Sequence, residues 1–245
     1  MKPFLALVFP LILLFCGCDP ASKSTTQETP TPAAQEPLSP SELADPIAEI
    51  KKLGGKVTLN ESGEVIEVSL FYTKKVTDAG LENLKGLTSL TDLSLGSTQV
   101  TDAGLDHLKG LTSLKYLDLS YTKITDAGLE HLKGLTSLTD LRLSGTQITD
   151  FGLKHLRGLT SLNLLFLSDT QITDAGLKHL KGMTSLNTLF LSNTQITDAG
   201  MEHLQSLTNL KTLWLFNSQI TGAGLTELRA ALPKCNIIQC KIVID

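Results

Sequence analysis

The sequence predicts an α/β solenoid, with short parallel strands on a concave face and short helices or turns on a convex face. Three observations predict this class. A threonine recurs every 24 residues, so that six full units occupy residues 77–220. Leu93 and Leu95 alternate as one face of a strand requires, while Leu81 and Leu84 have the spacing of one helix face. A single unit cannot bury its own apolar side chains, so stacked neighbours must complete the core. The recurring threonines are Thr77, Thr101, Thr125, Thr149, Thr173, Thr197 and Thr221.

The repeated unit resembles a known family. Residues 125–148 read TDAGLEHLKGLTSLTDLRLSGTQI, which resembles the leucine-rich repeat LxxLxLxxN with threonine in the asparagine position. The ITDAGL segment is similar to the cysteine-containing class of this repeat, which occurs in ubiquitin-ligase F-box proteins, and to repeats of bacterial exported proteins. The resemblance implies a horseshoe-shaped leucine-rich-repeat solenoid.

The N-terminal segment predicts export. Lys2 precedes an apolar run over residues 4–15, which is shorter than the roughly 20 residues of a membrane-spanning helix but fits a signal peptide. The following Cys16-Gly17-Cys18 resembles a bacterial lipobox, in which a small residue precedes the cysteine that is lipidated. The resemblance implies a signal peptide over residues 1–17 and lipidation of Cys18, so that the protein is exported and lipid-anchored in the bacterial cell envelope. An ordinary signal with incidental cysteines is the alternative.

Residues 18–44 are predicted to form a disordered tether. Five prolines lie there among Ser, Thr, Gln, Glu and Ala. Such a composition cannot bury enough apolar surface to offset the entropy of ordering it. A tether of this kind would hold the folded domain clear of a membrane surface.

Residues 45–76 are predicted to form an N-terminal cap, because terminal repeats otherwise expose their core. Ile47, Ile50 and Leu53 indicate a short helix over residues 45–53. Residues 57–59 and 65–70 then flank a turn sequence and predict a hairpin whose second strand begins the sheet.

Residues 221–245 are predicted to form the C-terminal cap, as a seventh unit that breaks at Pro233. Cys235, Ile238 and Cys240 are expected at core positions within it. Buried thiols are the preferred interpretation of the two cysteines, and a Cys235–Cys240 disulfide is the alternative.

Recurring polar residues have predicted structural roles. Thr77 and Asp78 suit a helix N-terminus, as capping side chain and as partner of the helix dipole. A second row of hydroxyls is expected to satisfy backbone groups in the turn after each strand. This row comprises Thr98, Thr122, Thr146, Thr170, Thr194 and Ser218.

Composition and motifs exclude several function classes. The chain has 245 residues, 21 basic and 25 acidic, with a formal net charge of −4 and a pI of about 5.7. It lacks the clustered basic character of a nucleic-acid-binding domain. The sequence has no phosphate-binding loop, nucleophile elbow, CxxC or HExxH motif. We therefore expect no catalytic residue, no enzyme activity, no cofactor and no metal site.

All histidines occupy one repeat position. A metal-binding or pH-sensing ladder is one interpretation. A hydrogen-bonding row that was copied with the repeat is the interpretation we favour, because metal sites need converging ligands. The five are His107, His131, His155, His179 and His203.

The residue between the two inward leucines of each strand is expected on the concave face. Along the chain it changes from polar to aromatic, in the order Ser94, Asp118, Arg142, Phe166, Phe190 and Trp214. Aromatic side chains are favoured binding anchors, and an exposed patch of several of them is often functional. A stacked, strand-favouring row without a ligand is the alternative. The predicted partner-binding residues, expected to be exposed, are Phe166, Phe190, Trp214, Phe216, Leu164 and Arg142.

These features predict a non-catalytic protein- or peptide-binding module that is tethered to the cell envelope and binds an unknown partner through its concave face. An F-box-like substrate adaptor or effector of a ubiquitin ligase is an alternative, which the signal peptide and the lack of an F-box-like segment oppose. A passive structural component of the envelope is another. Glycan binding is a third, because aromatic rows can stack on sugars.

Overall fold

The computed structural model describes residue 39 and residues 42–239. The chain divides into two units, residues 1–33 and residues 34–245, and the described residues all belong to the second. The predicted signal peptide, the predicted lipidation site Cys18, nearly all of the predicted tether and Cys240 lie outside the described residues.

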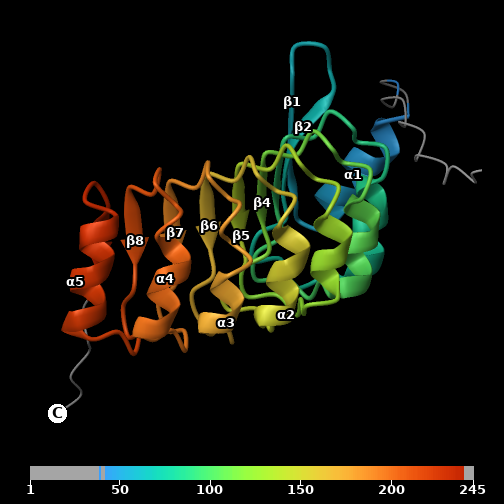
Figure 1. Cartoon of the computed structure of the whole chain (residues 1–245). Coiled ribbons are helices and arrows are strands. Elements are labelled where there is room, and N and C mark those ends of the chain that lie inside the picture. Colours follow the sequence, from blue (N-terminus) through green and yellow to red (C-terminus); the bar gives the residue numbers. More distant parts are fainter. Residues whose placement is uncertain (1–38, 40–41, 240–245) are drawn as a thin grey trace, which may run out of the picture. The chain divides into compact units, whose positions relative to one another are not determined.

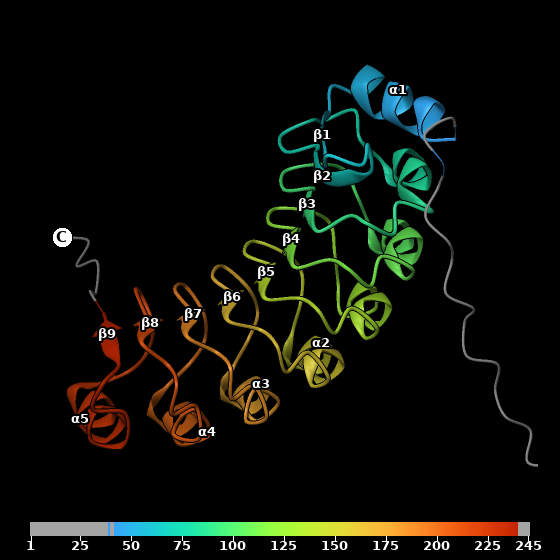
Figure 2. The same cartoon turned by 90° about the horizontal axis from the view of Figure 1, so that it is seen from above.

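Nine strands of the described residues form one sheet, in the order in which they occur in the chain. β1 and β2 pair antiparallel as the predicted hairpin, and every later pair is parallel. Figure 1 shows the strands side by side, and Figure 2 shows them along the inner edge of an arc. The strands are β1 (Lys56–Leu59), β2 (Val65–Ser69), β3 (Asp92–Ser94), β4 (Tyr116–Asp118), β5 (Asp140–Arg142), β6 (Leu164–Phe166), β7 (Thr188–Phe190), β8 (Thr212–Trp214) and β9 (Asn236–Ile238).

Short helices lie along the outer edge of the arc (Figure 2). Several are 3-10 helices, labelled η, of three to seven residues, in keeping with the use of this helix type in short pieces. Helices outside and parallel strands inside confirm the predicted horseshoe solenoid. The helices are α1 (Ala44–Lys52), η1 (Asp78–Leu84), η2 (Asp102–Leu108), η3 (Gly128–Leu132), α2 (Asp150–Leu153), η4 (Lys154–Leu156), α3 (Asp174–Leu177), η5 (Asp198–Gly200), α4 (Met201–Leu204) and α5 (Gly222–Ala231).

Leucines fill the space between the sheet and the helices. In each unit they lie at the same positions and are almost completely buried, and the units stack into one cluster that runs from Leu43 to Ile237. Ile50 of α1 and Leu228 of α5 cover the two ends of this cluster. Because the core is continuous and covered at both ends, residues 34–245 contain a complete folding unit.

The C-terminal cap differs from the prediction in register. Ile237 takes the core position, and Ile238 lies beside Trp214 on the concave face. The reason is that β9 pairs Asn236 with Thr212, so the inward alternation falls on Ile237. Cys235 packs half-buried against the core, and burial raises the pKa of its thiol to about 11.

The hydroxyl row after the strands has its predicted role. The Oγ1 of Thr98 donates a hydrogen bond of 2.6 Å to the carbonyl oxygen of Leu95. The equivalent bond has the same length in the next four units. Ser218 is the exception, since its buried Oγ has no hydrogen-bond partner among residue 39 and residues 42–239. Serine lacks the β-branching that holds a threonine in one rotamer.

The aspartate after each capping threonine links neighbouring units, which the sequence analysis did not predict. The Asp78 carboxylate accepts hydrogen bonds of 2.7 Å from both the backbone N–H and the hydroxyl of Thr101 in the next unit. The same pair of bonds recurs in each later unit up to Thr221. The predicted capping role holds from Thr125 onward but not for Thr77 and Thr101, whose side chains make no capping hydrogen bond.

The glycine three residues after each threonine from Thr101 to Thr221 leaves room for the aspartate of the preceding unit. A Cβ on Gly104 would lie 2.5 Å from Asp78 Oδ1, which is closer than real Cβ contacts allow. The next five units repeat this close approach. The three residues therefore form one structural device, in which the aspartate of one unit bonds to the threonine and packs on the glycine of the next.

Replacing Gly176 by alanine is expected to lower the free energy of unfolding by about 1–3 kcal/mol, as overpacking does. The new Cβ would overlap Asp150, which two hydrogen bonds to Thr173 hold in place. Gly182→Ala is the matched control, because a Cβ there meets no atom within 4 Å. Urea unfolding of both variants measures the difference, and equal stability of the two would show that the aspartate gives way freely.

Candidate partner-binding surface

The predicted concave row is present and in register. Phe166 of β6 pairs with Arg142 of β5 on one side and with Phe190 of β7 on the other. Trp214 of β8 follows Phe190, and Ile238 of β9 follows Trp214. Buried leucines flank Arg142, Phe166, Phe190 and Trp214, and buried Ile237 precedes Ile238, so strand alternation directs these side chains toward the concave side.

The aromatic rings stack on one another along this row. The ring centroids of Phe166 and Phe190 are 4.0 Å apart with an interplanar angle of 10°. Those of Phe190 and Trp214 are 5.5 Å apart at 9°, and Phe216 lies 5.5 Å from Trp214 in a tilted arrangement. These side chains are consequently half-buried rather than exposed as predicted. Their faces cover each other, and their edges form the outer surface of the row.

Arg142 closes the stack at its N-terminal end. Its guanidinium carbon lies 4.8 Å from the ring centroid of Phe166 and 5.2 Å from that of Tyr116 on β4. A guanidinium between two aromatic faces is held by cation–π attraction and by packing. Tyr116 was not among the predicted residues, and its burial, followed by the Asp118 carboxylate, raises the pKa of its hydroxyl.

Leu164 extends the row sideways. It lies two residues before Phe166 on β6 and therefore points to the same face, half-buried. All six predicted partner-binding side chains thus lie on the C-terminal half of one concave surface. We call the stack of Phe166, Phe190 and Trp214, together with Phe216 and Leu164, the aromatic row.

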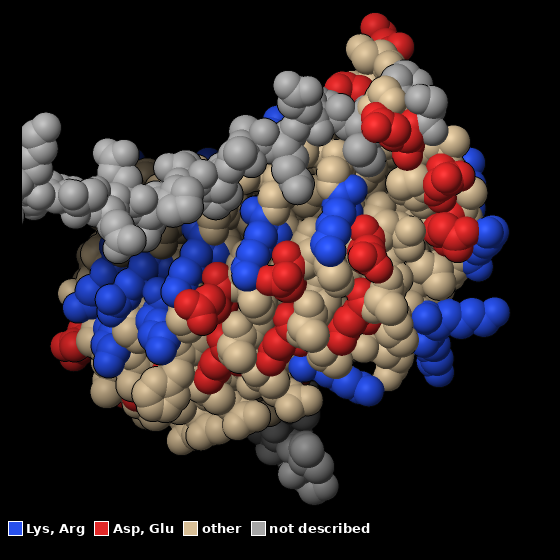
Figure 3. Space-filling view, turned by 90° about the vertical axis from the view of Figure 1, so that its right-hand side faces the viewer, with Lys and Arg blue, Asp and Glu red and all other residues tan. Residues whose placement is uncertain are grey.

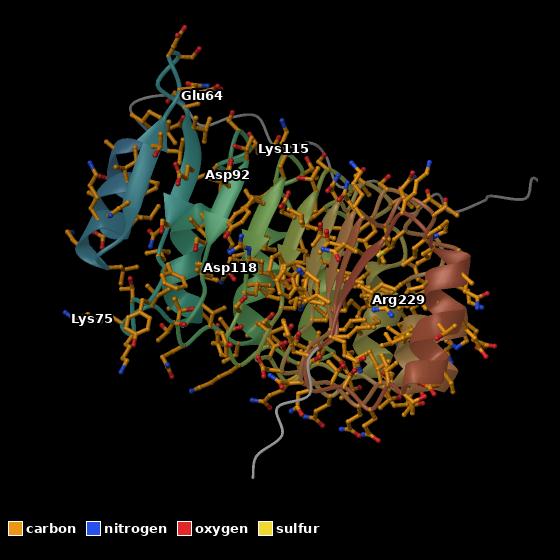
Figure 4. All side chains as sticks on the ribbon, turned by 90° about the vertical axis from the view of Figure 1, so that its left-hand side faces the viewer. Glu64, Lys75, Asp92, Lys115, Asp118 and Arg229 are labelled. Atoms are coloured by element: carbon orange, nitrogen blue, oxygen red, sulfur yellow. The ribbon has the colours of Figure 1, made fainter. Side chains whose placement is uncertain are left out.

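Carboxylates occupy the other half of the concave surface. Figure 4 shows Asp92 and Asp118 on neighbouring strands of this face. A depression of about 340 Å³ lies beside them, lined by residues of β2 and β3 and by Tyr116. None of these carboxylates forms an ion pair with a cation among the residues that the structure describes. The acidic end comprises Glu67, Asp92, Asp118 and Asp140.

The acidic end differs in how firmly its members are held. Asp118 is buried and accepts a hydrogen bond of 2.9 Å from the backbone N–H of Ser120. Asp92 and Asp140 each accept a bond from the preceding threonine and remain partly open to solvent. The more open pair is therefore better placed to meet a cationic group of a partner.

The histidines line the helical side rather than the concave face. They are half-buried, and the Nδ1 atoms of all but His179 form no hydrogen bond among the described residues. In His179 this atom accepts a 3.0 Å bond from Arg157 Nε. No set of three metal-binding side chains converges within the described part of the chain. The row therefore offers one imidazole per repeat, and those of His131 and His203 lie 3.6 Å and 3.3 Å from the carboxylates of Asp106 and Glu202.

His179 is expected to titrate below an ordinary histidine. Burial lowers its pKa, and the charge of Arg157 lowers it further. A lowered pKa means that the fold favours neutral imidazole, so this contribution to stability is present above the ordinary pKa and is lost as the pH falls through the folded one. An NMR titration should show the shift, and Arg157→Ala should reduce it while the distant Lys85→Ala does not. A pKa at or above 6.5 would contradict the prediction.

Comparison with known proteins agrees with this architecture. A family model for the leucine-rich repeat matches residues 88–148, and a model for two copies of the repeat matches residues 184–230. Among solved structures, internalin C2 from Listeria monocytogenes is 27% identical with a TM-score of 0.58, covering 80% of this chain and 92% of that one. A leucine-rich-repeat protein of Leptospira interrogans is 25% identical with a TM-score of 0.51, over 64% of this chain and 45% of that one. No curated protein matches the chain.

The repeat geometry and these matches identify the folded unit as a leucine-rich-repeat domain. Domains of this class typically mediate protein–protein interactions and are generally not catalytic. None of the helices in the described residues is long and apolar enough to cross a membrane.

Proposed function

We propose that the protein is a non-catalytic binding module that is tethered to the bacterial cell envelope and recognises a protein or peptide through its concave face. The aromatic row carries this proposal. Its rings are already fixed by stacking on one another, so a partner that buries them loses little additional side-chain entropy. Aromatic anchors of this kind commonly dominate interface energetics.

The direction of the rings favours a protein partner over a glycan. Sugars stack on open aromatic faces, whereas the faces of Phe166, Phe190 and Trp214 are turned toward their neighbours in the row. A row of ring edges suits the apolar side chains of a peptide or a strand. The carboxylates of the acidic end lie on β2 to β5. We therefore expect the partner to carry cationic groups on the side that faces these strands, because charges across an interface are complementary.

The test uses residues 34–245 as bait against envelope and secreted proteins. A version with Phe166, Phe190 and Trp214 replaced by serine is compared with one that carries Phe71→Ser and Tyr121→Ser, two exposed aromatics outside the row. Purified captured proteins are then measured by calorimetry. The proposal requires a partner that the control version binds and the row variant does not. If no protein binds the domain with a dissociation constant below about 1 mM, a passive structural role is favoured.

The cell-envelope part of the proposal depends on Cys18. The motivation is the short apolar segment that ends in Cys16-Gly17-Cys18. We expect cleavage after Gly17 and attachment of at least two acyl chains, because one chain alone binds membranes only marginally. Intact mass and fatty-acid labelling of the native protein measure this, and Cys18→Ala should release the protein from the membrane fraction. An unlipidated native protein with the same location would refute it.

The repeat subclass belongs to the same proposal. The ITDAGL segment supports the cysteine-containing class of leucine-rich repeats, with threonine at the turn position. The alternative of an F-box-like adaptor shares this class, and a cytosolic native protein would favour it over an envelope module.

A further inference from the structure

The charge pattern of the convex face changes in two adjacent units. In the first three units an acidic residue is followed, three residues later, by a lysine with which it forms an ion pair. These pairs are Glu82–Lys85 at 3.8 Å, Asp106–Lys109 at 2.5 Å and Glu130–Lys133 at 2.9 Å. Figure 3 shows Lys and Arg beside Asp and Glu over these units, and Lys and Arg gathered together at the left of the view.

The next two units replace the acidic residue by lysine. One unit has Lys154 and, three residues later, Arg157. The next unit has Lys178 and Lys181 at the same positions. All four side chains are exposed, and none forms an ion pair with a carboxylate among the described residues. The bond from Arg157 to His179 links the two units directly. Four cations therefore repel one another at the positions where the first three units have neutral ion pairs.

An exposed aromatic ring adjoins these cations. Phe151 is 74% exposed and occupies a position where each of the other units has alanine. It lies three residues before Lys154 and so shares a face of the helical segment α2–η4 with it. The basic–aromatic patch consists of Phe151, Lys154, Arg157, Lys178 and Lys181.

We propose that the basic–aromatic patch docks on an anionic phospholipid bilayer surface. Lysine and arginine side chains near such a surface are each attracted to it, and an exposed phenylalanine on a helix can bury its ring at the boundary between headgroups and acyl chains. The patch spans only two neighbouring helices, about 10 Å apart. That area is small for a stable protein interface, which needs about 800 Å² from each partner, but it suffices for additive electrostatic attraction to a membrane. The patch lies on the helical side, so docking leaves the concave face free.

Vesicle binding by residues 34–245 tests the proposal without any contribution from a lipid anchor, so it can fail or succeed independently of the proposal for Cys18. The domain should bind vesicles that contain phosphatidylglycerol and not vesicles of phosphatidylcholine alone, and added salt should weaken binding. Lys154→Glu with Lys178→Glu should lower the partition coefficient at least about tenfold, since each cation contributes about fivefold. Phe151→Ala should lower it by about threefold or more.

The matched control is Lys85→Glu with Lys109→Glu, which makes the same change in net charge on the same face but outside the patch. The fold-decrease in the partition coefficient of this control should be less than about a third of the fold-decrease in the patch variant. Equal loss in both double variants, or equal binding to neutral and anionic vesicles, would overturn the proposal. The proposal would also fail if the domain bound polyglutamate as tightly as anionic vesicles and Phe151→Ala had no effect on either. The patch would then be a site for an acidic protein. Thermal unfolding of each variant confirms that it is folded.

Discussion

Trp214→Ala is expected to weaken binding of the partner by about thirtyfold or more, because truncating a central aromatic anchor commonly costs about 2–4 kcal/mol. Trp214 contacts Phe190 and Phe216 and stands near the middle of the aromatic row. The loss should appear mainly in the dissociation rate. Surface plasmon resonance with the captured partner measures it.

Two controls separate binding from stability. Ser94→Ala changes the equivalent concave position near the acidic end and should change affinity little. The unfolding free energy of Trp214→Ala should fall by about 1–3 kcal/mol, the value of the two aromatic pairs lost with Phe190 and Phe216. Leu213→Ala, its fully buried neighbour on β8, should cost about 2–5 kcal/mol. Unchanged affinity in Trp214→Ala, or the same loss in Ser94→Ala, would place the binding surface elsewhere.

Ending the chain at Leu232 should destabilise the C-terminal end of the solenoid severely. The truncation removes β9, whose backbone bonds to Lys211 and Leu215 close the last parallel pair. It also removes Ile237 from the core and leaves β8 as an open strand edge, which favours aggregation. Hydrogen exchange should show lost protection in residues 197–220 while the central units keep theirs, since stability in such arrays is local.

Point substitutions in β9 refine this prediction. Ile237→Ser should reproduce part of the fraying because the side chain is buried in the core, and Ile238→Ser should not because that side chain lies on the concave face. Full protection of residues 197–220 in the truncated chain would mean that α5 alone covers the end.

The fold was predictable because one period carries nearly all the information. A 24-residue repeat whose leucines alternate in one half and follow helix spacing in the other leaves few arrangements that bury them, and the horseshoe is one. The C-terminal cap was predicted one residue out of register at Ile238, because the chain there has no complete unit from which to count.

The contacts between units were harder to predict. Asp78 looks like a residue that favours a helix N-terminus, and its bonds to Thr101 become apparent only when two units are placed side by side. One signal was present in the sequence. The last unit has Gly222 at the aspartate position, and no threonine follows it that could donate hydrogen bonds to an aspartate there.

The concave surface was predicted in position but not in exposure. Strand alternation places Phe166, Phe190 and Trp214 on one face, but the angle between neighbouring rings depends on packing that no periodicity records. The position of Tyr116 against Arg142 was missed for the same reason, since the two residues belong to different columns of the repeat.

The contacts from the aspartate of one unit to the threonine and glycine of the next make the length of the concave surface adjustable. Each of these contacts joins a unit only to the next unit along the chain. A unit can therefore be added or removed without changing the contacts within the other units. Every added unit would move the carboxylates of β3 away from the rings of β6 by one strand spacing, about 4.8 Å. The number of units between β3 and β6 therefore sets the distance between the carboxylates and the rings. Under the proposed function, we expect that distance to match the separation of cationic and apolar groups on the partner.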